Sequence, residues 1–543
     1  MYWSKTPIID HITGGHLNLE IIIRYRIHTV LLLVVLMGYA CKDTPPPGNE
    51  MPDEGVIFID LSNRIQEMEG FGASDAWSVQ YVGNWPDEKR NHIADLLFSM
   101  DEDDLGNPIG IGLNTWRFNV GAGSIAQGGS SNINDKWRRT EGFLQNDGTY
   151  DWDQQSGQQW FLQAARERGV EKFTAFVNSP PVQLTKNGKA NTSVAGSSNL
   201  DRENYENYAD FLVQVLDHFR KEEELGFDLI SPLNEPQWDW DGGQEGCPFI
   251  NSEISGLTRV LSEKLLSADV STLIELSEAG DIIYLYDDLT DKNKRDNQIE
   301  EFFGSGDNSL SSLSNISLNI AGHSYWSTDK SELIPQRTAL RDKVESNSSL
   351  NGYTMSEFCI MDYEEIQGNG RDLGILPALY MARVIHYDLT IANASSWQWW
   401  LAVSPYDYKD GLIYIDKSET DGQVYTSKML YALGNYSRFI DAGMQRVETT
   451  QLFDKSNEDD YTYSRVMTSA YVSEANNKVV IVMVNYNNWE YTTSFDLGLE
   501  WSEKPMQIYR TSATENLKLT GVQNVNEDIK IAPQSITTYV IHK

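Results

Sequence analysis

Leu229-Ile-Ser-Pro-Leu-Asn-Glu-Pro-Gln-Trp238 is an apolar, strand-like run that ends in a carboxylate, Glu235, and breaks its pattern at the next proline. Gly352-Tyr-Thr-Met-Ser-Glu-Phe358 repeats this arrangement around Glu357. In a barrel of parallel strands, the carboxyl ends of the strands build the active site. We therefore expect both glutamates to face one pocket. The alternative is a purely structural role, in which Glu235 caps a helix and Glu357 follows a buried strand.

The chain around these two stretches alternates strand-like apolar runs with helical patterns from about residue 70 to residue 403, which is typical of a parallel sheet wrapped in helices. After Asp201, for example, apolar residues recur at spacings of three and four until Gly226 ends the predicted helix. Eight runs have strand character: 70–74, 115–120, 173–178, 227–233, 271–277, 318–323, 353–357 and 395–399. Eight such strands predict an α/β fold, the (β/α)8 TIM barrel, over residues 70–435.

The C-terminal part has a different character. Residues 451–543 contain short alternating runs, such as 478–484, 492–497 and 535–541, separated by Asn, Asp and Gly. This pattern predicts a side antiparallel β-sandwich over residues 436–543. Residues 55–69, which precede the barrel, are expected to add a strand to that sandwich.

The first 54 residues are expected to lie outside the fold. Arg24 and Arg26 precede an apolar run, 30–37, that is too short to span a bilayer, and the run ends in Gly-Tyr-Ala-Cys41. This pattern resembles a bacterial lipoprotein signal over residues 1–41, with Cys41 as the lipidated residue and 42–54 as a flexible, Pro-rich tether. An ordinary signal peptide is the alternative. We expect a lipid-anchored protein of the bacterial cell envelope, exposed on the outer-membrane surface, and otherwise a secreted one.

The charge and cysteine content of the chain limit which ligands and binding partners it can have. The 543 residues include 43 Lys and Arg against 79 Asp and Glu, a formal net charge of −36. So acidic a surface repels phosphate backbones, which argues against nucleic-acid binding and leaves neutral polymers as possible substrates. Beyond Cys41, only Cys247 and Cys359 remain, too few for a disulfide framework or a cysteine metal cluster. We expect a monomer without a metal or cofactor.

Several short motifs occur in a fixed order from about Glu69 to the C-terminus. They are Glu69-Gly-Phe-Gly-Ala-Ser74, Trp116-Arg-Phe-Asn119, Ser179-Pro-Pro181 with Asn187-Gly188, Asn234-Glu-Pro236, Ser356-Glu-Phe358 and Tyr431-Ala-Leu-Gly-Asn-Tyr-Ser-Arg-Phe-Ile440. Together they resemble glycoside hydrolase family 30. The resemblance implies a (β/α)8 barrel with a side β-sandwich, which periodicity also predicts. It further implies that Glu235 is the general acid/base and Glu357 the nucleophile of a retaining glycosidase.

The chemistry of retaining hydrolysis fits this assignment, because it needs one protonated and one ionised carboxyl group. Arg117 is the expected cation beside Glu357, with His323 and Tyr325 as further donors. Asn234 is expected to hydrogen-bond a sugar hydroxyl near the reacting centre. A plain salt bridge for Arg117 and a satisfied core histidine for His323 are the alternatives.

Tryptophans follow several of the predicted strands. Pyranose rings present flat C–H faces that stack on indole, and Trp399 matches the family position for such a platform. Trp400 points to the other side of the strand and is expected to serve packing. Trp238 and Trp240, in the loop after Glu235, are candidates for lining the leaving-side subsites, and so is Trp77 after the first predicted strand.

Two further features bear on the substrate. Where many family members read Ser-Pro-Pro-X-Trp-Met, this chain reads Ser-Pro-Pro-Val-Gln-Leu184, so Gln183 is expected to face the sugar. The segment Gln244-Glu-Gly-Cys247 resembles the endo-β-1,6-galactanase branch of the family. We therefore expect a galactanase acting on arabinogalactan side chains, with Gln183, Asp75 and Trp77 as candidates for reading the C4 hydroxyl. A β-1,6-glucanase, an endo-β-1,4-xylanase and a non-catalytic surface glycan-binding lipoprotein are the alternatives.

Overall fold

The computed structural model describes residues 55–289, 294–450 and 466–543. The predicted targeting segment, the tether and Cys41 therefore lie outside the described residues. No helix within the described ranges has both the length and the apolar character needed to cross a membrane.

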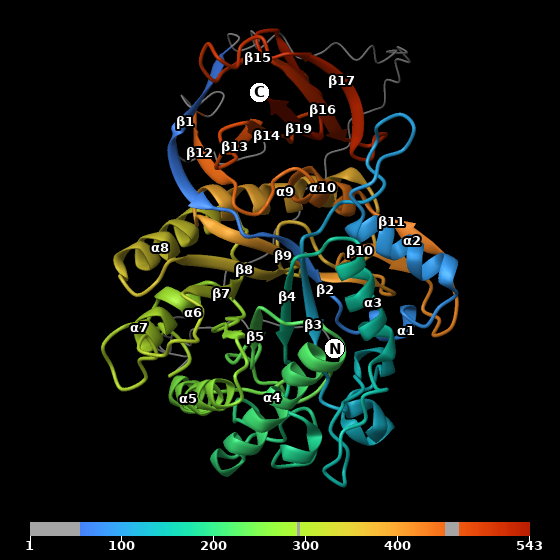
Figure 1. Cartoon of the computed structure of the whole chain (residues 1–543), viewed down its shortest axis with the longest axis vertical. Coiled ribbons are helices and arrows are strands. Elements are labelled where there is room, and N and C mark those ends of the chain that lie inside the picture. Colours follow the sequence, from blue (N-terminus) through green and yellow to red (C-terminus); the bar gives the residue numbers. More distant parts are fainter. Residues whose placement is uncertain (1–54, 290–293, 451–465) are drawn as a thin grey trace, which may run out of the picture. The chain divides into compact units, whose positions relative to one another are not determined.

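The predicted (β/α)8 barrel with a side β-sandwich is confirmed (Figure 1). The barrel strands are β2 (Gly70–Ser74), β3 (Thr115–Asn119), β4 (Lys172–Phe176), β5 (Leu229–Ser231), β6 (Leu273–Ile274), β7 (Asn319–His323), β8 (Gly352–Phe358) and β9 (Ala394–Ser404). Neighbours pair in parallel from β2 to β6 and from β7 to β9, and β9 pairs with β2. Parallel bridges from Ile274 to Ile316 and from Ala279 to Gly322 join β6 to β7, so the circle is closed.

Helices surround these strands in Figure 1. They are α1 (Val79–Val82), α2 (Asp87–Phe98), α3 (Ser156–Glu167), α4 (Tyr205–Glu222), α5 (Asn251–Ser267), α6 (Ile283–Tyr286), α7 (Gln298–Phe303), α8 (Leu333–Ser346) and α9 (Ile375–Thr390). Most bury one apolar stripe, as amphipathic helices do. Helix α9 is buried on nearly every residue, because it contacts β9 of the barrel as well as strands of the sandwich.

The sandwich contains one strand from before the barrel. Its strands are β1 (Val56–Glu67), β12 (Gln445–Thr449), β13 (Val466–Val472), β14 (Lys478–Asn485), β15 (Tyr491–Asp496), β16 (Pro505–Thr511), β17 (Lys518–Asn524), β18 (Ile529–Ile531) and β19 (Ser535–His542). Strand β1 pairs antiparallel with β12 and parallel with β15, so the sheet is not purely antiparallel. Apolar residues such as Ile57, Val447, Ile481 and Met506 form its core.

Helix α10 (Lys428–Ser437) joins the barrel to the sandwich and carries the motif 431–440. A methyl group on Gly434 would lie 2.8 Å from Ile111 of the barrel and 2.9 Å from Leu517 of the sandwich, so a glycine is needed for this close approach. Asn435 donates to the Thr538 hydroxyl at 2.9 Å. Arg438 donates to carbonyl groups of the segment between α2 and β3. The sandwich thus packs firmly against the barrel.

A short hairpin extends the barrel sheet beyond β9. Its strands are β10 (Gly411–Ile415), which pairs in parallel with the end of β9, and β11 (Val424–Thr426). The loop between β9 and β10 contains Asp410, which lies near the site described below.

Candidate active site

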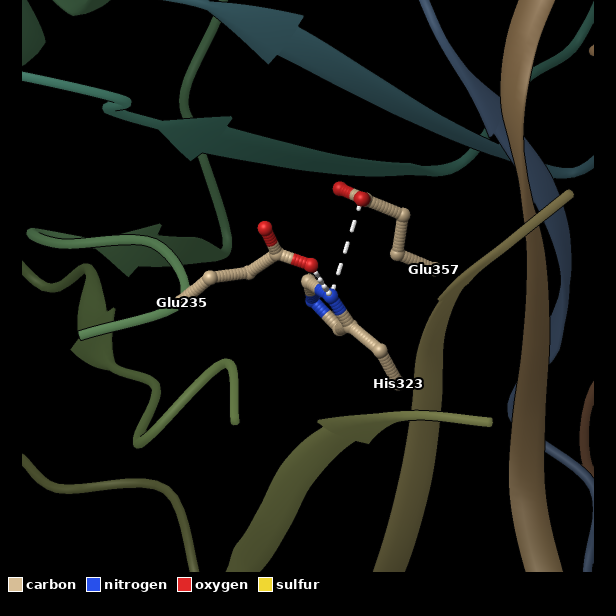
Figure 2. Close-up of side chains that lie close together, drawn as sticks. All are labelled: Glu235, His323 and Glu357. Carbon is tan, nitrogen blue, oxygen red and sulfur yellow. Dashed lines mark hydrogen bonds and ion pairs between the residues drawn. The ribbon is translucent and has the colours of Figure 1, made fainter. Parts of the chain in front are cut away.

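Glu235 and Glu357 reach the pocket from two different strand ends. Glu235 follows β5 in a left-handed backbone conformation, φ 44°, and its N–H donates to the Glu278 carbonyl at 2.8 Å. Glu357 is the last residue but one of β8. A carboxylate oxygen of each lies within 4.8 Å of the other (Figure 2). Retaining glycosidases place their carboxyl groups about 5–5.5 Å apart, whereas inverting ones need about 6.5–9.5 Å.

Glu357 accepts hydrogen bonds from two buried donors. One Oε accepts from Arg117 Nη1 at 2.5 Å, and the other accepts from the Tyr325 hydroxyl at 3.0 Å. The Arg117 guanidinium lies over the Phe176 ring at 3.9 Å, and its Nη2 donates to the Asn234 Oδ1 at 3.2 Å. These contacts, on a buried carboxylate, suit a nucleophile that must remain charged.

His323, at the end of β7, links the acid/base to a third carboxylate. Its Nδ1 lies 2.9 Å from Glu235 Oε1, and its Nε2 lies 3.0 Å from Glu278 Oε2. Burial alone would lower the pKa of His323, but the Glu357 carboxylate and the bonds to the other two glutamates outweigh it and raise that pKa to about 10. The ring therefore carries two protons at neutral pH and donates to Glu235 and Glu278. Neither nitrogen then has a free lone pair for a metal.

Glu235 has the opposite character to Glu357. Burial raises the pKa of its carboxyl group to about 7, although His323 acts in the other direction. The nearby Glu357 carboxylate adds to the increase. A carboxyl group with this pKa still holds its proton in mildly acidic water and can lose it at little cost, which is what a general acid requires.

Glu278 is the main residue that sequence reasoning missed. It lies just after β6, is fully buried, and forms an ion pair with Arg117, whose Nη2 lies 3.2 Å from its Oε2. Hydroxyl groups of Ser231 and Ser356 donate to its two oxygens, each at 2.6 Å. The predicted strand 271–277 ended one residue before it, so the strand-end rule that selected Glu235 and Glu357 could also have selected Glu278.

The predicted site tryptophans differ in burial and in the contacts that they make. Trp399 is completely buried and donates from its indole to the Asp410 carbonyl at 2.7 Å, so its role as a sugar platform stays a prediction. Trp400 contacts Trp77 edge to face, with ring centroids 5.3 Å apart. Trp238 is half-buried and packs edge to face against Trp326.

Other predicted site residues make contacts within the protein. Asp75 is buried, accepts the Asn119 N–H at 2.7 Å, and has a pKa raised by burial to about 8. Gln183 is half-buried and donates to the Leu144 carbonyl at 2.8 Å. Direct contacts thus link Glu235, Glu357, Arg117, Asn234, His323 and Tyr325, whereas roles for Asp75 and Gln183 at the sugar stay predictions.

The segment Gln244–Cys247 supports the loops around the site. Glu245 is buried, and its carboxyl group accepts backbone N–H groups of Ala122, Ser124 and Thr140 at 3.1–3.4 Å. Gly246 lies against the Trp240 ring, where a methyl group would be 2.2 Å from it. The Trp240 indole in turn donates to the Glu235 carbonyl at 2.8 Å. Trp240 is therefore buried and holds the backbone of Glu235, and its role in a leaving-side subsite stays a prediction.

A parallel barrel that brings oxygens of two buried carboxyl groups within 4.8 Å of each other at its strand ends has the architecture of a glycoside hydrolase. The comparison with known families specifies which kind. Residues 54–414 match the model described as O-Glycosyl hydrolase family 30, and the chain belongs to that family.

Individual relatives agree with this placement. The chain is 26% identical over 460 residues to an endo-β-1,6-galactanase from Hypocrea rufa, covering 81% of this chain and 83% of that protein. A conserved exported protein from Bacteroides fragilis has a similar crystal structure, with a TM-score of 0.83, 33% identity, and 89% of this chain and all of that one covered. The catalytic domain of GH30 xylanase C from Talaromyces cellulolyticus shares the fold, with a TM-score of 0.65 at 20% identity over 90% of this chain and all of that one.

Proposed function

We propose that the protein is a retaining glycosidase in which Glu235 is the general acid/base and Glu357 the nucleophile. The observation that supports this most is the approach of their carboxylate oxygens to within 4.8 Å in opposite environments. Arg117 and Tyr325 hold the Glu357 carboxylate, whereas burial keeps a proton on Glu235.

In the first step, the Glu357 carboxylate attacks the anomeric carbon while the Glu235 carboxyl group gives its proton to the glycosidic oxygen. The C–O bond breaks, the leaving sugar departs as an alcohol, and a covalent glycosyl ester remains on Glu357. In the second step, the Glu235 carboxylate takes a proton from water, and the water oxygen attacks the anomeric carbon and releases Glu357. His323, which donates to Glu235, stabilises that residue's anion between the two steps.

The stereochemical course tests this mechanism directly. ¹H NMR of a reaction in progress should show the product first in the β-configuration, before mutarotation. An initial α-product would contradict the retaining mechanism. Glycan binding without release of any reducing end would instead support the alternative of a non-catalytic glycan-binding protein.

For the substrate, we propose internal β-1,6-galactosidic bonds in the side chains of arabinogalactan. The curated relative named endo-β-1,6-galactanase supports this proposal, since it aligns with most of the chain. The segment Gln244–Cys247 supports it as well, because it resembles the endo-β-1,6-galactanase branch of the family. β-1,6-Glucan differs from this galactan only at the C4 hydroxyl and is the most demanding competitor.

The experiment compares three polymers at equal mass concentration. Purified enzyme is incubated with de-arabinosylated arabinogalactan, β-1,6-glucan and glucuronoxylan, and the products are sized over time. We expect galactose oligomers of several lengths from the first polymer, which would show internal cleavage. Activity confined to the glucan or the xylan would overturn the proposed substrate, and early release of single sugars alone would indicate exo action.

We also propose that Cys41 carries a lipid that anchors the enzyme in the bacterial cell envelope. The support is the short apolar run 30–37 after two arginines, followed by a cysteine and a Pro-rich segment. A relative with 33% identity is itself named an exported protein.

A further inference from the structure

We propose that Glu278 is a positioning residue that fixes His323 and Arg117 as the two cations flanking the Glu235–Glu357 pair. This inference rests on the proposed catalytic roles and deepens them. Among the described residues, the Glu278 side chain bonds to His323, Arg117, Ser231 and Ser356 and not to the side chains of Glu235 or Glu357. It acts through its neighbours.

The geometry around Glu278 is that of a fully satisfied buried anion. Its Oε2 accepts hydrogen bonds from His323 Nε2 at 3.0 Å and from the Ser356 hydroxyl at 2.6 Å. The same oxygen forms an ion pair with Arg117 Nη2 at 3.2 Å. Its Oε1 receives the Ser231 hydroxyl at 2.6 Å. The side chain has no exposed surface, and donors from β3, β5, β7 and β8 converge on it. A buried charge is tolerated only when it is paired and hydrogen-bonded in this way.

Each of the two cations contacts Glu278 through one nitrogen and a catalytic glutamate through another. His323 donates from Nε2 to Glu278 and from Nδ1 to Glu235. Arg117 uses Nη2 toward Glu278 and Nη1 toward Glu357. Removing the Glu278 charge would therefore weaken the orientation of both cations at the same time.

The buried charges around the catalytic pair sum to zero only when the Glu278 carboxylate is included. With Glu235 protonated, the cations Arg117 and His323 face the anions Glu278 and Glu357. Burial works to raise the pKa of Glu278, but Arg117 and the bonds from His323 and Ser231 outweigh it and hold that pKa well below its usual range. Glu278 therefore remains charged at any pH at which the enzyme would work.

Its neighbour Glu275 provides a matched control. Glu275 is buried three residues earlier, and its Oε2 lies 3.1 Å from the Ser231 hydroxyl oxygen. Burial, with the Glu278 carboxylate next in effect, raises the pKa of Glu275 to about 8, so below that pH it is uncharged. Glu275→Gln replaces a neutral acid by a neutral amide, whereas Glu278→Gln removes a charge.

The sign of the expected effect follows from Coulomb's law. Removing an anion makes every nearby proton easier to lose, so the pKa of His323 and that of Glu235 both fall in Glu278→Gln. Loss of an ion partner shifts a pKa by about 1–3 pH units. Below pH 8, Glu275→Gln should change neither value appreciably.

The first test needs no substrate. In full-length protein labelled with [¹³Cε1]histidine, the His323 signal is assigned by its loss in His323→Asn and followed from pH 5 to pH 10. In the wild type it should stay in the doubly protonated form beyond pH 8, and in Glu278→Gln its midpoint should fall by about 1–3 pH units. A wild-type midpoint near the ordinary value of about 6.5 would overturn the proposal even if Glu278→Gln failed to fold.

The second test uses turnover on the polymer that the enzyme cleaves. The alkaline limb of kcat/KM should move to lower pH in Glu278→Gln and stay in place in Glu275→Gln, with thermal unfolding recorded for both. Equal shifts in the two variants, or none in Glu278→Gln, would overturn the proposal. If no polymer is cleaved but the His323 midpoint falls as expected, the role of Glu278 stands and the proposed catalytic function fails.

Discussion

Glutamine at either catalytic position should separate the two proposed roles. Glu357→Gln removes the nucleophile, and turnover should fall on the order of 10⁴-fold or more on every substrate. Glu235→Gln removes the proton donor, which costs about 10²–10⁴-fold on polymers. A dinitrophenyl glycoside has a leaving group that needs no proton, so Glu235→Gln should still form its glycosyl-enzyme rapidly. Initial rates on both substrate types check this, and an equal loss on both would contradict the role of Glu235.

The pKa of Glu235 sets the expected pH dependence. A general acid must hold its proton in the free enzyme, and burial raises this pKa to about 7. Therefore kcat/KM on a polymer should be high below pH 7 and decline tenfold per unit well above it. On the dinitrophenyl glycoside, the rate of glycosyl-enzyme formation should lack this limb. A profile on the polymer that stays flat to pH 9 would show that Glu235 does not act as the acid.

The loop after β5 should be sensitive to a single methyl group. Gly246→Ala places a carbon 2.2 Å from the Trp240 ring, and Trp240 holds the Glu235 carbonyl. Overpacking of this kind costs about 1–3 kcal/mol, and we expect kcat to fall about 10–100-fold as Glu235 shifts. Gly226→Ala is the control, because nothing lies within 4 Å of its added carbon. Unchanged kcat in Gly246→Ala would show that Trp240 does not position the acid.

The strands that build the barrel could be predicted because each is an apolar run, but their lengths could not. Runs 227–233 and 271–277 shorten to three paired residues in β5 and two in β6. Beyond β6 the chain leaves the ladder, and Glu278 takes a left-handed conformation, φ 51°. Sequence periodicity does not encode such departures, although the position of Glu278 directly after the predicted strand 271–277 was a signal that could have marked it.

The direction of side chains in loops could not be predicted from the sequence either. Strand alternation predicts which face a residue takes, but Trp238 and Trp240 follow a strand and obey no period. Trp240 is buried because Gly246 packs against its ring and its indole donates to the Glu235 carbonyl, whereas Trp238 is half-buried. The motif around Gln244 could be recognised from sequence, whereas its structural task could not.

The barrel and the sandwich should fold as one unit. Strand β1 enters the sandwich before the chain builds the barrel, and α9 is buried on both sides. A fragment of residues 70–435 would expose these faces, so we expect it to be insoluble or to bind hydrophobic dyes, whereas residues 55–543 should show one cooperative thermal transition. A soluble, active fragment would contradict this expectation, and two separate transitions in residues 55–543 would indicate independent domains.

The whole chain is expected to reside in the membrane fraction of the cell. If Cys41 is lipidated, wild-type protein should partition into detergent and sediment with membranes, because acyl chains contribute about 0.8 kcal/mol per buried CH₂. Cys41→Ala should move it to the soluble fraction without changing its specific activity, since Cys41 lies far along the chain from the site residues, which fall between residues 75 and 399. Cys247→Ala is the control for loss of a cysteine: that thiol is buried and accepts the Asn199 N–H at 3.3 Å, so the variant should remain in the membrane. Protein from Cys41→Ala that still sediments with membranes would overturn the lipid anchor, and labelling with a radioactive fatty acid would locate any acyl chain directly.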